Sequence, residues 1–273
     1  MAPLYHKALV VGATSGIGLT LAGKLVATGT KVVAVGRRQD RLDALVQTHG
    51  RDSLSAVAFD VTRLSGIQSF AQGVLRDHPD IDCVVINSGI QRGFDFSNPE
   101  TLDLSVLSDE LTTNYTSAVY LTAAFLPHLK SQTRGAHLVY VGATLALIPS
   151  MIRTPNYNAS KAALHSFIMN VRKQLAEAGQ AHVRMIEVFP PAVQTELHDD
   201  NHQPDLVNGG EIGMPVVEFV DRMYEGLARG DDQFAVGPGE NLLKEGGWET
   251  QRAEMFEQQQ VVLNNALAKY LRK

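Results

Sequence analysis

The sequence predicts an α/β fold, a doubly wound parallel sheet of about seven strands with helices on both faces. Short runs rich in β-branched residues alternate along the chain with longer segments that carry apolar residues at three- and four-residue intervals. The short runs are almost continuously apolar, as expected of parallel strands buried on both faces. A glycine-rich turn follows the first of these runs, which is typical of the first strand–helix connection in such a sheet.

The alternation predicts each element by position. Strands are expected at 8–11, 31–35, 54–59, 83–87, 137–141, 183–189 and 233–236. Helices are expected at 17–27, 41–48, 64–77, 104–129 and 157–178. The chain of 273 residues has ample length for one core, and no repeat, low-complexity tract or linker divides it. We therefore expect a single domain that covers residues 1–273.

Three stretches depart from this alternation. Residues 190–213 are rich in Pro, Asp, Asn, His and Gly and are too long for a simple connection, so we expect a substrate loop there. Residues 237–247 form a second irregular stretch, and a helical tail is expected at about 248–273. Four apolar residues of the tail make a narrow stripe, which we interpret as a docking face rather than a binding site. They are Leu263, Leu267, Tyr270 and Leu271.

Composition limits the compartment and the partners of the protein. The formal net charge is −5 and no basic run is present, so nothing favours binding to nucleic acid. No apolar stretch approaches the length of a membrane span, and the apolar run near the first residues is too short for a secretion signal. The single cysteine, Cys83, cannot form an internal disulfide. We therefore expect a cytoplasmic protein with no membrane or nucleic-acid partner.

The turn after the first strand has the pattern G-x-x-x-G-x-G, with glycines at 12, 16 and 18. Glycine permits a tight turn and a close approach of the backbone to a ligand, and the N-terminus of the following helix offers unpaired N–H groups to a pyrophosphate. This spacing differs from the commoner G-x-G-x-x-G, but its place between a strand and a helix predicts a Rossmann-type dinucleotide site.

Residues at the ends of the next strands indicate which dinucleotide is bound. Arg37 and Arg38 follow the second strand, where an acidic residue would favour NAD and an arginine accommodates the 2′-phosphate of NADP. Arg37 therefore favours NADP(H), with Ser15 or Arg38 as possible helpers; the alternative is a solvated surface pair. Asp60 closes the third strand and could hold the edge of the adenine ring.

Tyr157 and Lys161 are spaced by four residues and so leave the same side of the expected helix. A nearby positive charge favours the phenolate and is expected to lower the pKa of the tyrosine, which makes the pair a plausible acid–base device.

Taken together, these motifs resemble those of the short-chain dehydrogenase/reductase family over nearly the whole chain. The glycine motif is similar to that family's Thr-Gly-x-x-x-Gly-x-Gly, with Val11 in place of the threonine. Asn87-Ser88-Gly89 resembles its Asn-Ala-Gly, and Tyr157 and Lys161 match its Tyr-x-x-x-Lys. Asn114 matches the asparagine of its catalytic tetrad, and residues 190–195 resemble its Pro-Gly-x-Val-x-Thr.

The resemblance implies a set of functional residues and partners. It implies catalysis by Asn114, Thr144, Tyr157 and Lys161, and a homodimer or homotetramer packed through the helices that carry Asn114 and Tyr157. With the arguments above, the residues expected to bind the cofactor are Gly12, Thr14, Ser15, Gly16, Ile17, Gly18, Arg37, Arg38, Asp60, Val61, Asn87, Gly89, Tyr157, Lys161, Pro190, Val193 and Thr195.

One position departs from the family pattern. The family places a catalytic serine thirteen residues before the tyrosine, and this count leads to Thr144. Threonine keeps a hydroxyl that can polarise a carbonyl oxygen, although its methyl group restricts χ1. A shift of one residue would put Ala143 there instead, with no hydroxyl. We favour Thr144 as the working substitute.

The resulting expectation is an NADPH-dependent oxidoreductase that interconverts an alcohol and the ketone or aldehyde of a small or medium metabolite. A non-redox epimerase, dehydratase or cyclase on the same scaffold is the alternative, and a catalytically silent nucleotide-binding protein is a third. The substrate is expected near Gln91, Phe94, Met151 and Asn156. His198 and His202 are spaced like metal ligands but fall in the irregular loop, so we expect an acidic lid there and no metal.

Overall fold

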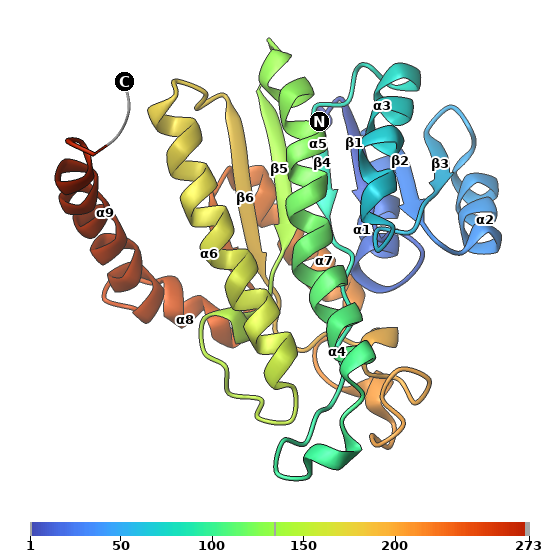
Figure 1. Ribbon diagram of the computed structural model, residues 1–273. Helices are drawn as coiled ribbons and strands as arrows, with labels where there is room; N and C mark the ends of the chain where they lie inside the picture. The colour runs from blue at the N-terminus through green and yellow to red at the C-terminus, as the bar shows by residue number, and fades with distance from the viewer. Residues whose placement is uncertain (1, 134, 271–273) are drawn as a thin grey trace.

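The computed structural model describes residues 2–133 and 135–270. Its centre is a parallel sheet of seven strands in the order β3-β2-β1-β4-β5-β6-β7 (Figure 1). The strands are β1 (Lys7–Val11), β2 (Lys31–Gly36), β3 (Leu54–Ala58), β4 (Cys83–Ile86), β5 (Ala136–Val141), β6 (Val183–Phe189) and β7 (Gln233–Ala235). All pairs are parallel. The predicted doubly wound sheet is therefore confirmed.

Two groups of helices cover the sheet. One face is covered by α1 (Gly16–Ala27), α2 (Gln39–His49) and α7 (Val216–Arg229). The other is covered by α3 (Ile67–Asp77), α5 (Ser117–Ser131) and α6 (Pro155–Glu177). Alternate residues of each strand enter the two cores: Val10 packs with α1 and α7, whereas Leu9 packs with α3 and α5.

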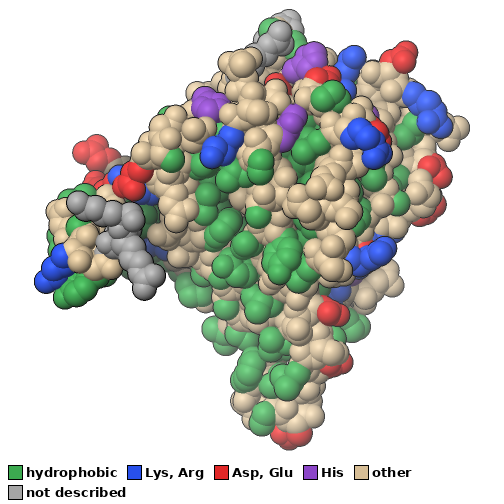
Figure 2. Space-filling model, turned by 45° about the horizontal axis from the view of Figure 1, so that its top comes forward, with side chains coloured by type: hydrophobic (Ala, Val, Ile, Leu, Met, Phe, Trp, Pro, Cys, Tyr) green, Lys and Arg blue, Asp and Glu red, His purple; other side chains and the backbone are tan. Residues whose placement is uncertain are grey.

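The surface over α5 and α6 differs from the rim of the molecule. Figure 2 shows hydrophobic side chains spread over the middle of this face and down to the lower tip, with most charged side chains toward the edges. Exposed apolar residues on the segments concerned are Phe96, Leu104, Leu111, Tyr120, Ile148 and Ile152.

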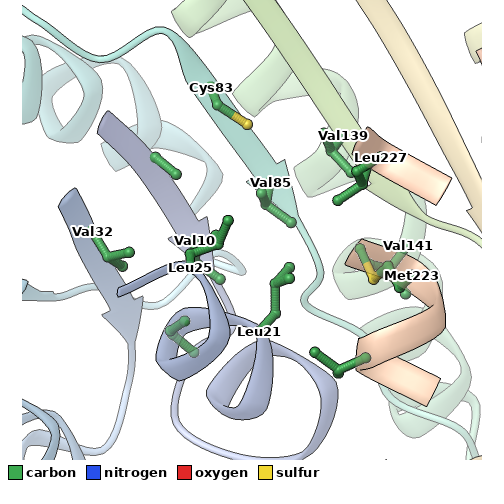
Figure 3. Packing of buried hydrophobic residues seen from close by; sticks show 14 of the residues in the cluster. Val10, Leu21, Leu25, Val32, Cys83, Val85, Val139, Val141, Met223 and Leu227 are labelled. Atoms are coloured by element: carbon green, nitrogen blue, oxygen red, sulfur yellow. The ribbon is translucent and has the colours of Figure 1, made fainter. Parts of the chain in front are cut away.

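The core between the sheet and helices α1 and α7 is tightly packed. In Figure 3, Leu21 and Leu25 of α1 lie close to Val10 and Val85 of the central strands. Cys83 also belongs to this core as a free, fully buried thiol, as expected of a small apolar strand residue.

Helix α7 is absent from the predicted elements. Its apolar residues Phe219, Val220, Met223 and Leu227 do have helical spacing, but the segment lies between an irregular loop and a short strand. Burial of these residues against α1 stabilises the helix. Lys24 of α1 also contacts Asp221 of α7 at 2.7 Å.

The predicted helix at 104–129 is continuous in the structure but not uniformly α-helical. It consists of α4 (Leu104–Leu111), a π-helical segment Thr112–Thr116, and α5. Such segments are uncommon and are frequent at functional sites. Asn114 lies inside this one.

The irregular stretches contain short helical turns. The loop 190–213 includes the 3₁₀ turns Glu196–His198 and Gly209–Glu211, and a backbone bridge joins Val193 to Met214. The stretch 237–247 contains the 3₁₀ turn Gly237–Gly239 and α8 (Glu240–Leu243).

Helix α9 (Trp248–Leu267) forms the predicted tail, and Glu249 is its one buried residue within the described part of the chain. Of the apolar stripe, Leu263, Leu267 and Tyr270 are exposed, and Leu271 lies outside the described residues. The docking role of the stripe stays a prediction. Among the described residues, no helix combines the length and hydropathy needed to cross a membrane.

Two helical glycines provide a test of the packing between α7 and the sheet. A Cβ on Gly226 would lie 2.6 Å from two carbons of the Phe234 ring, whereas a Cβ on Gly73 of α3 would meet no atom within 4 Å. Gly226→Ala should therefore lower the free energy of unfolding by roughly 1–3 kcal/mol through overpacking. Gly73→Ala should raise it by about 1 kcal/mol through helix propensity. Urea unfolding of both variants checks this; equal changes in the two would contradict the packing described.

Candidate active site

A cavity of about 490 Å³ lies at the carboxyl ends of the strands, the edge at which ligands bind in open parallel sheets. Its walls come from the turns that follow β1, β2, β3, β4, β5 and β6, together with the first turns of α6. Its size is in the range of small-molecule and cofactor sites. All predicted cofactor residues line it except Gly18.

The glycine turn is shaped by three close approaches. Gly12 and Gly16 have φ values of +88° and +52°, a region that favours glycine. A Cβ on Gly12 would lie 2.8 Å from Ser88 N, and a Cβ on Gly18 would overlap Gly12 O. The Asn87 side chain donates to Gly12 O at 3.0 Å. The turn thus brings the N-terminus of α1 to the wall of the cavity with glycines at 12 and 16, which suits a pyrophosphate.

Arg38 is fully engaged by protein groups. Its guanidinium donates to Ser15 Oγ at 2.7 Å and to Thr14 Oγ1 at 3.0 Å, and pairs with Glu196 at 2.7 Å. Arg41 of α2 pairs with the same Glu196 carboxylate. These two arginines hold the pKa of Glu196 below its usual range against the opposing effect of burial.

Arg37 is the arginine available to a ligand. Its side chain is 65% exposed, and its contact with Asp60 is 3.8 Å long. Asp60 itself accepts hydrogen bonds from the backbone N–H and hydroxyl of Thr62 at 2.9 and 2.8 Å. A 2′-phosphate could therefore engage Arg37 without breaking a strong ion pair.

Tyr157 and Lys161 meet in the cavity as their spacing predicts. Both lie on the first turns of α6, which begins at Pro155, and both side chains are buried and line the cavity. Lys161 Nζ donates to Val141 O at 2.8 Å and lies 5.7 Å from the centre of the Tyr157 ring. The Tyr157 hydroxyl makes no hydrogen bond with residues 2–133 or 135–270.

The pKa of Tyr157 moves in the direction opposite to the prediction. Burial, followed by the nearby carboxylate of Glu110, raises the pKa of the tyrosine well above its ordinary value. Burial also lowers the pKa of Lys161 to about 8, although the carboxylates of Glu187 and Glu110 oppose this. The predicted lowering by Lys161 does not dominate because desolvation acts on both groups. The phenol is therefore held in its protonated form.

Asn114 lies beside the other two residues without lining the cavity. Its side chain is buried and exchanges two hydrogen bonds of 2.9 Å with the backbone of Ile90, and it donates to Ser160 Oγ at 3.1 Å. A Cβ on Gly89 would lie 3.4 Å from Asn114 Oδ1 and 3.6 Å from Lys161 Nζ. Asn114 thus fixes the turn after β4 against α6.

Both candidates for the serine position line the cavity. Ala143 is extended, and Thr144 begins the 3₁₀ turn Thr144–Ala146. The Thr144 methyl group faces Gly239, since a Cβ there would overlap it. The Thr144 hydroxyl makes no hydrogen bond within the described residues.

The predicted substrate residues divide into two pairs. Gln91 and Met151 line the cavity, whereas Phe94 and Asn156 do not. Asn156 is instead committed to α4, where its amide donates to Glu110 Oε2 at 2.7 Å. The sequence pattern does not reveal this because Glu110 is distant in sequence.

The loop histidines also approach the cavity. His198 and His202 both line it; the His202 ring contacts Asp199 at 2.6 Å and the His198 ring contacts Gln203 at 3.2 Å. Within the described residues, no group of three or more His, Cys, Asp or Glu is arranged to hold a metal ion.

Four charged residues in or next to the cavity are absent from the predictions. They are Glu110, Glu196, Arg41 and Arg92. The partners of Glu196 lie more than 150 residues away in sequence, so no local pattern reports them. Arg92 follows the end of a predicted strand, and this position is the one feature of the sequence that could have indicated a place in the site.

Comparison with known proteins places the chain in a family. A family model described as short chain dehydrogenase matches residues 6–205. The uncharacterized oxidoreductase DltE of Bacillus subtilis is 33% identical over 229 residues, which cover 84% of this chain and 87% of DltE. The NADP-dependent 3-hydroxy acid dehydrogenase YdfG of Salmonella typhi is 33% identical over 186 residues, which cover 68% of this chain and 71% of YdfG.

Solved structures agree with this assignment. A short-chain dehydrogenase/reductase from Burkholderia phymatum in complex with NAD superposes with a TM-score of 0.77 at 21% identity and covers 87% of this chain and 91% of its own. A short chain dehydrogenase from Burkholderia cenocepacia in complex with NADP superposes with a TM-score of 0.71 at 25% identity over the full length of both chains. The protein belongs to the short-chain dehydrogenase/reductase family of oxidoreductases.

Proposed function

We propose that this oxidoreductase uses NADPH to reduce a ketone or aldehyde of a small or medium metabolite, or catalyses the reverse reaction. The observation that carries the proposal is the convergence of a protonated Tyr157, Lys161 and the glycine turn in one cavity. Consumption of reduced nicotinamide against a panel of carbonyl compounds tests it. Turnover of a substrate without any change in the nicotinamide would favour the non-redox alternative instead.

The preference for NADP(H) is supported by the environment of Arg37. The guanidinium is exposed at the end of β2 and has no close carboxylate partner among the described residues, and an arginine there can bind a 2′-phosphate through charge-assisted hydrogen bonds. YdfG is named as NADP-dependent. One similar structure contains NADP and another contains NAD, so the similar proteins alone do not distinguish between the two cofactors.

Each catalytic side chain has a role that follows from its environment. The bound cofactor would supply the hydride. Tyr157 would then donate its proton to the oxygen on which negative charge develops. Its raised pKa keeps the phenol protonated before the transfer, so the tyrosinate left behind needs stabilisation by a nearby positive charge. Lys161 would hold the ribose of the nicotinamide half and stabilise the tyrosinate that remains. Asn114 keeps the turn after β4 in contact with α6.

The substrate end of the cavity contains an arginine without a carboxylate partner. Arg92 is half-buried and donates to Gln91 O at 2.7 Å, and it makes no salt bridge within the described residues. Relatives named 3-hydroxy acid dehydrogenases act on a compound that carries a carboxylate. Short 3-oxo acids and uncharged ketones therefore belong in the same substrate panel.

We also propose a homodimer or homotetramer that packs through α4, α5 and α6. The exposed side chains of Leu111 and Tyr120 lie on α4 and α5. Figure 2 shows hydrophobic side chains gathered in the middle of one face of the molecule. Burial of such a patch stabilises association. The mass in solution, measured by light scattering, tests this proposal.

Tyr157→Phe tests the proton donor. The variant should lower kcat for carbonyl reduction by roughly 10²–10⁴-fold, because the ring is kept and the transferable proton is lost. NADPH binding, measured by fluorescence titration, should change little. Tyr224→Phe on α7 makes the same chemical change outside the cavity and should leave kcat unaltered. An active Tyr157→Phe enzyme would refute the assignment.

Substitutions at Thr144 and Ala143 test which of the two residues occupies the position of the family's catalytic serine. If Thr144 polarises the substrate oxygen, Thr144→Ala should reduce kcat by about 10²-fold and Thr144→Ser should retain most of it. If the position is Ala143, Thr144→Ala should have little effect and Ala143→Ser should raise kcat. Steady-state kinetics with one carbonyl substrate separate the two cases.

Arg37→Gln tests the cofactor preference. Loss of a charge-assisted hydrogen bond of about 1.5–3 kcal/mol should weaken NADPH binding by roughly 10- to 100-fold while leaving NADH binding nearly constant. Arg76→Gln removes the same charge from an exposed position on α3, outside the cavity, and should affect neither. The two dissociation constants are measured by titration. Equal losses for both cofactors would show that Arg37 does not read the 2′-phosphate.

A further inference from the structure

A second cluster of ionisable groups lies outside the cavity and is completely buried. His165 of α6 stands between two glutamates: its Nδ1 contacts Glu187 of β6 at 2.6 Å and its Nε2 contacts Glu249 of α9 at 3.0 Å. None of the three side chains has any exposed surface. They join three segments that are distant in sequence.

The hydrogen-bond pattern allows two protonation states of the cluster. An imidazole has one donor nitrogen and an imidazolium has two, whereas an ionised carboxylate only accepts. Two ionised glutamates therefore require an imidazolium at His165, and a neutral His165 requires a proton on one carboxyl group. In both cases one proton is shared among the three groups, and the cluster keeps one net negative charge.

Burial of such a cluster is costly unless its charges are compensated. On the side of α9, Arg252 pairs with Glu249 at 2.9 Å. On the side of the sheet, Glu187 Oε2 is bonded to His165, but Glu187 Oε1 is buried and has no hydrogen-bond partner in the described part of the chain. Simple anchoring of α9 through Glu249 does not account for a carboxylate oxygen left without a partner.

The free oxygen of Glu187 is directed toward the active site. A Cβ on Gly142 would lie 2.8 Å from Glu187 Oε1. The peptide that joins Val141 to Gly142 carries the carbonyl oxygen to which Lys161 Nζ donates. Tyr157, Lys161 and His165 follow one another at four-residue intervals and so lie along one side of α6.

We propose that Glu187 is a positioning residue for the active-site lysine, a buried carboxylate that stabilises the Lys161 ammonium beside Tyr157 while His165 and Glu249 hold it in place. This inference rests on the proposed function for its catalytic meaning. Its physical content concerns only the charge of Lys161.

Other charged groups act on the two residues and set the background for this effect. Lys161 also faces Tyr157 and the carboxylate of Glu110 from α4. The groups that face Glu187, apart from His165 and Glu249, are Tyr140 of β5 and Lys161 and Arg172 of α6. Arg172 is bound to the carbonyl oxygens of Met185 and Asp232 at 3.0 and 2.9 Å, and it forms no salt bridge among the described residues.

The titration of Lys161 tests the proposal without any turnover. Lysine side chains labelled with ¹³C are followed by NMR in the full-length protein, and the Lys161 signal is identified by its loss in Lys161→Met. Burial lowers the pKa of Lys161 to about 8 in the native protein. Glu187→Gln keeps the shape and removes the charge, so it should lower this pKa further, by about one pH unit.

Glu249→Gln is the matched control. It makes the same substitution on the other side of His165 and removes a carboxylate from an equivalent contact, but it leaves Glu187 unchanged. The titration of Lys161 should then stay within about 0.3 pH units of the native value. A purely structural cluster would give equal shifts in the two variants or none in either, and both outcomes would overturn the proposal.

Two further measurements complete the test. If Glu187→Gln fails to fold, Glu187→Asp withdraws the charge by one methylene group and should lower the pKa of Lys161 by a smaller amount; an unchanged titration would overturn the proposal. In the reductase assay, the alkaline limb of the pH profile should move to lower pH in Glu187→Gln. A shifted titration with an unmoved limb would count against the proposed role of Lys161 in catalysis, and not against the effect of Glu187.

Discussion

The parallel pairing of β1 with β4 is the constraint on which the site depends. The chain runs outward from β1 to β3 and then returns to place β4 on the other side of β1. The turns after these two strands therefore leave the sheet in opposite directions, and a crevice opens between them. Gly12 and Ser88 meet at this crevice, and their contact leaves no room for a Cβ.

Helix α6 both packs against the sheet and buries ionisable side chains, whose desolvation is unfavourable. It packs its apolar residues into the core beside β6, and it also carries three ionisable side chains, at 157, 161 and 165, into buried positions. Desolvation raises the pKa of the phenol and lowers that of the ammonium, so both groups favour their uncharged forms. Carboxylates at Glu110 and Glu187 counteract this for the lysine, and they come from two different elements, α4 and β6.

The loop 190–213 supplies several residues to the wall of the cavity. Its residue Glu196 pairs with Arg38 and Arg41, while His198 and His202 also line the cavity. The Arg38 guanidinium therefore has close hydrogen-bond partners within the protein, whereas the Arg37 guanidinium has only the 3.8 Å contact with Asp60 among the described residues. The distinction between adjacent arginines is a consequence of where Glu196 lies.

The sequence by itself determined the fold class, the strands, most of the helices and the glycine turn, because apolar periodicity and glycine geometry are local properties. It also brought Tyr157 and Lys161 together, since one helical turn separates them. Tertiary structure decided what sequence spacing cannot report: the direction of the Tyr157 pKa, the engagement of Arg38 by Glu196, the diversion of Asn156 to Glu110, and the burial of His165 between two glutamates. These depend on desolvation and on partners that are remote along the chain, and both exist only once the sheet and its helices have packed.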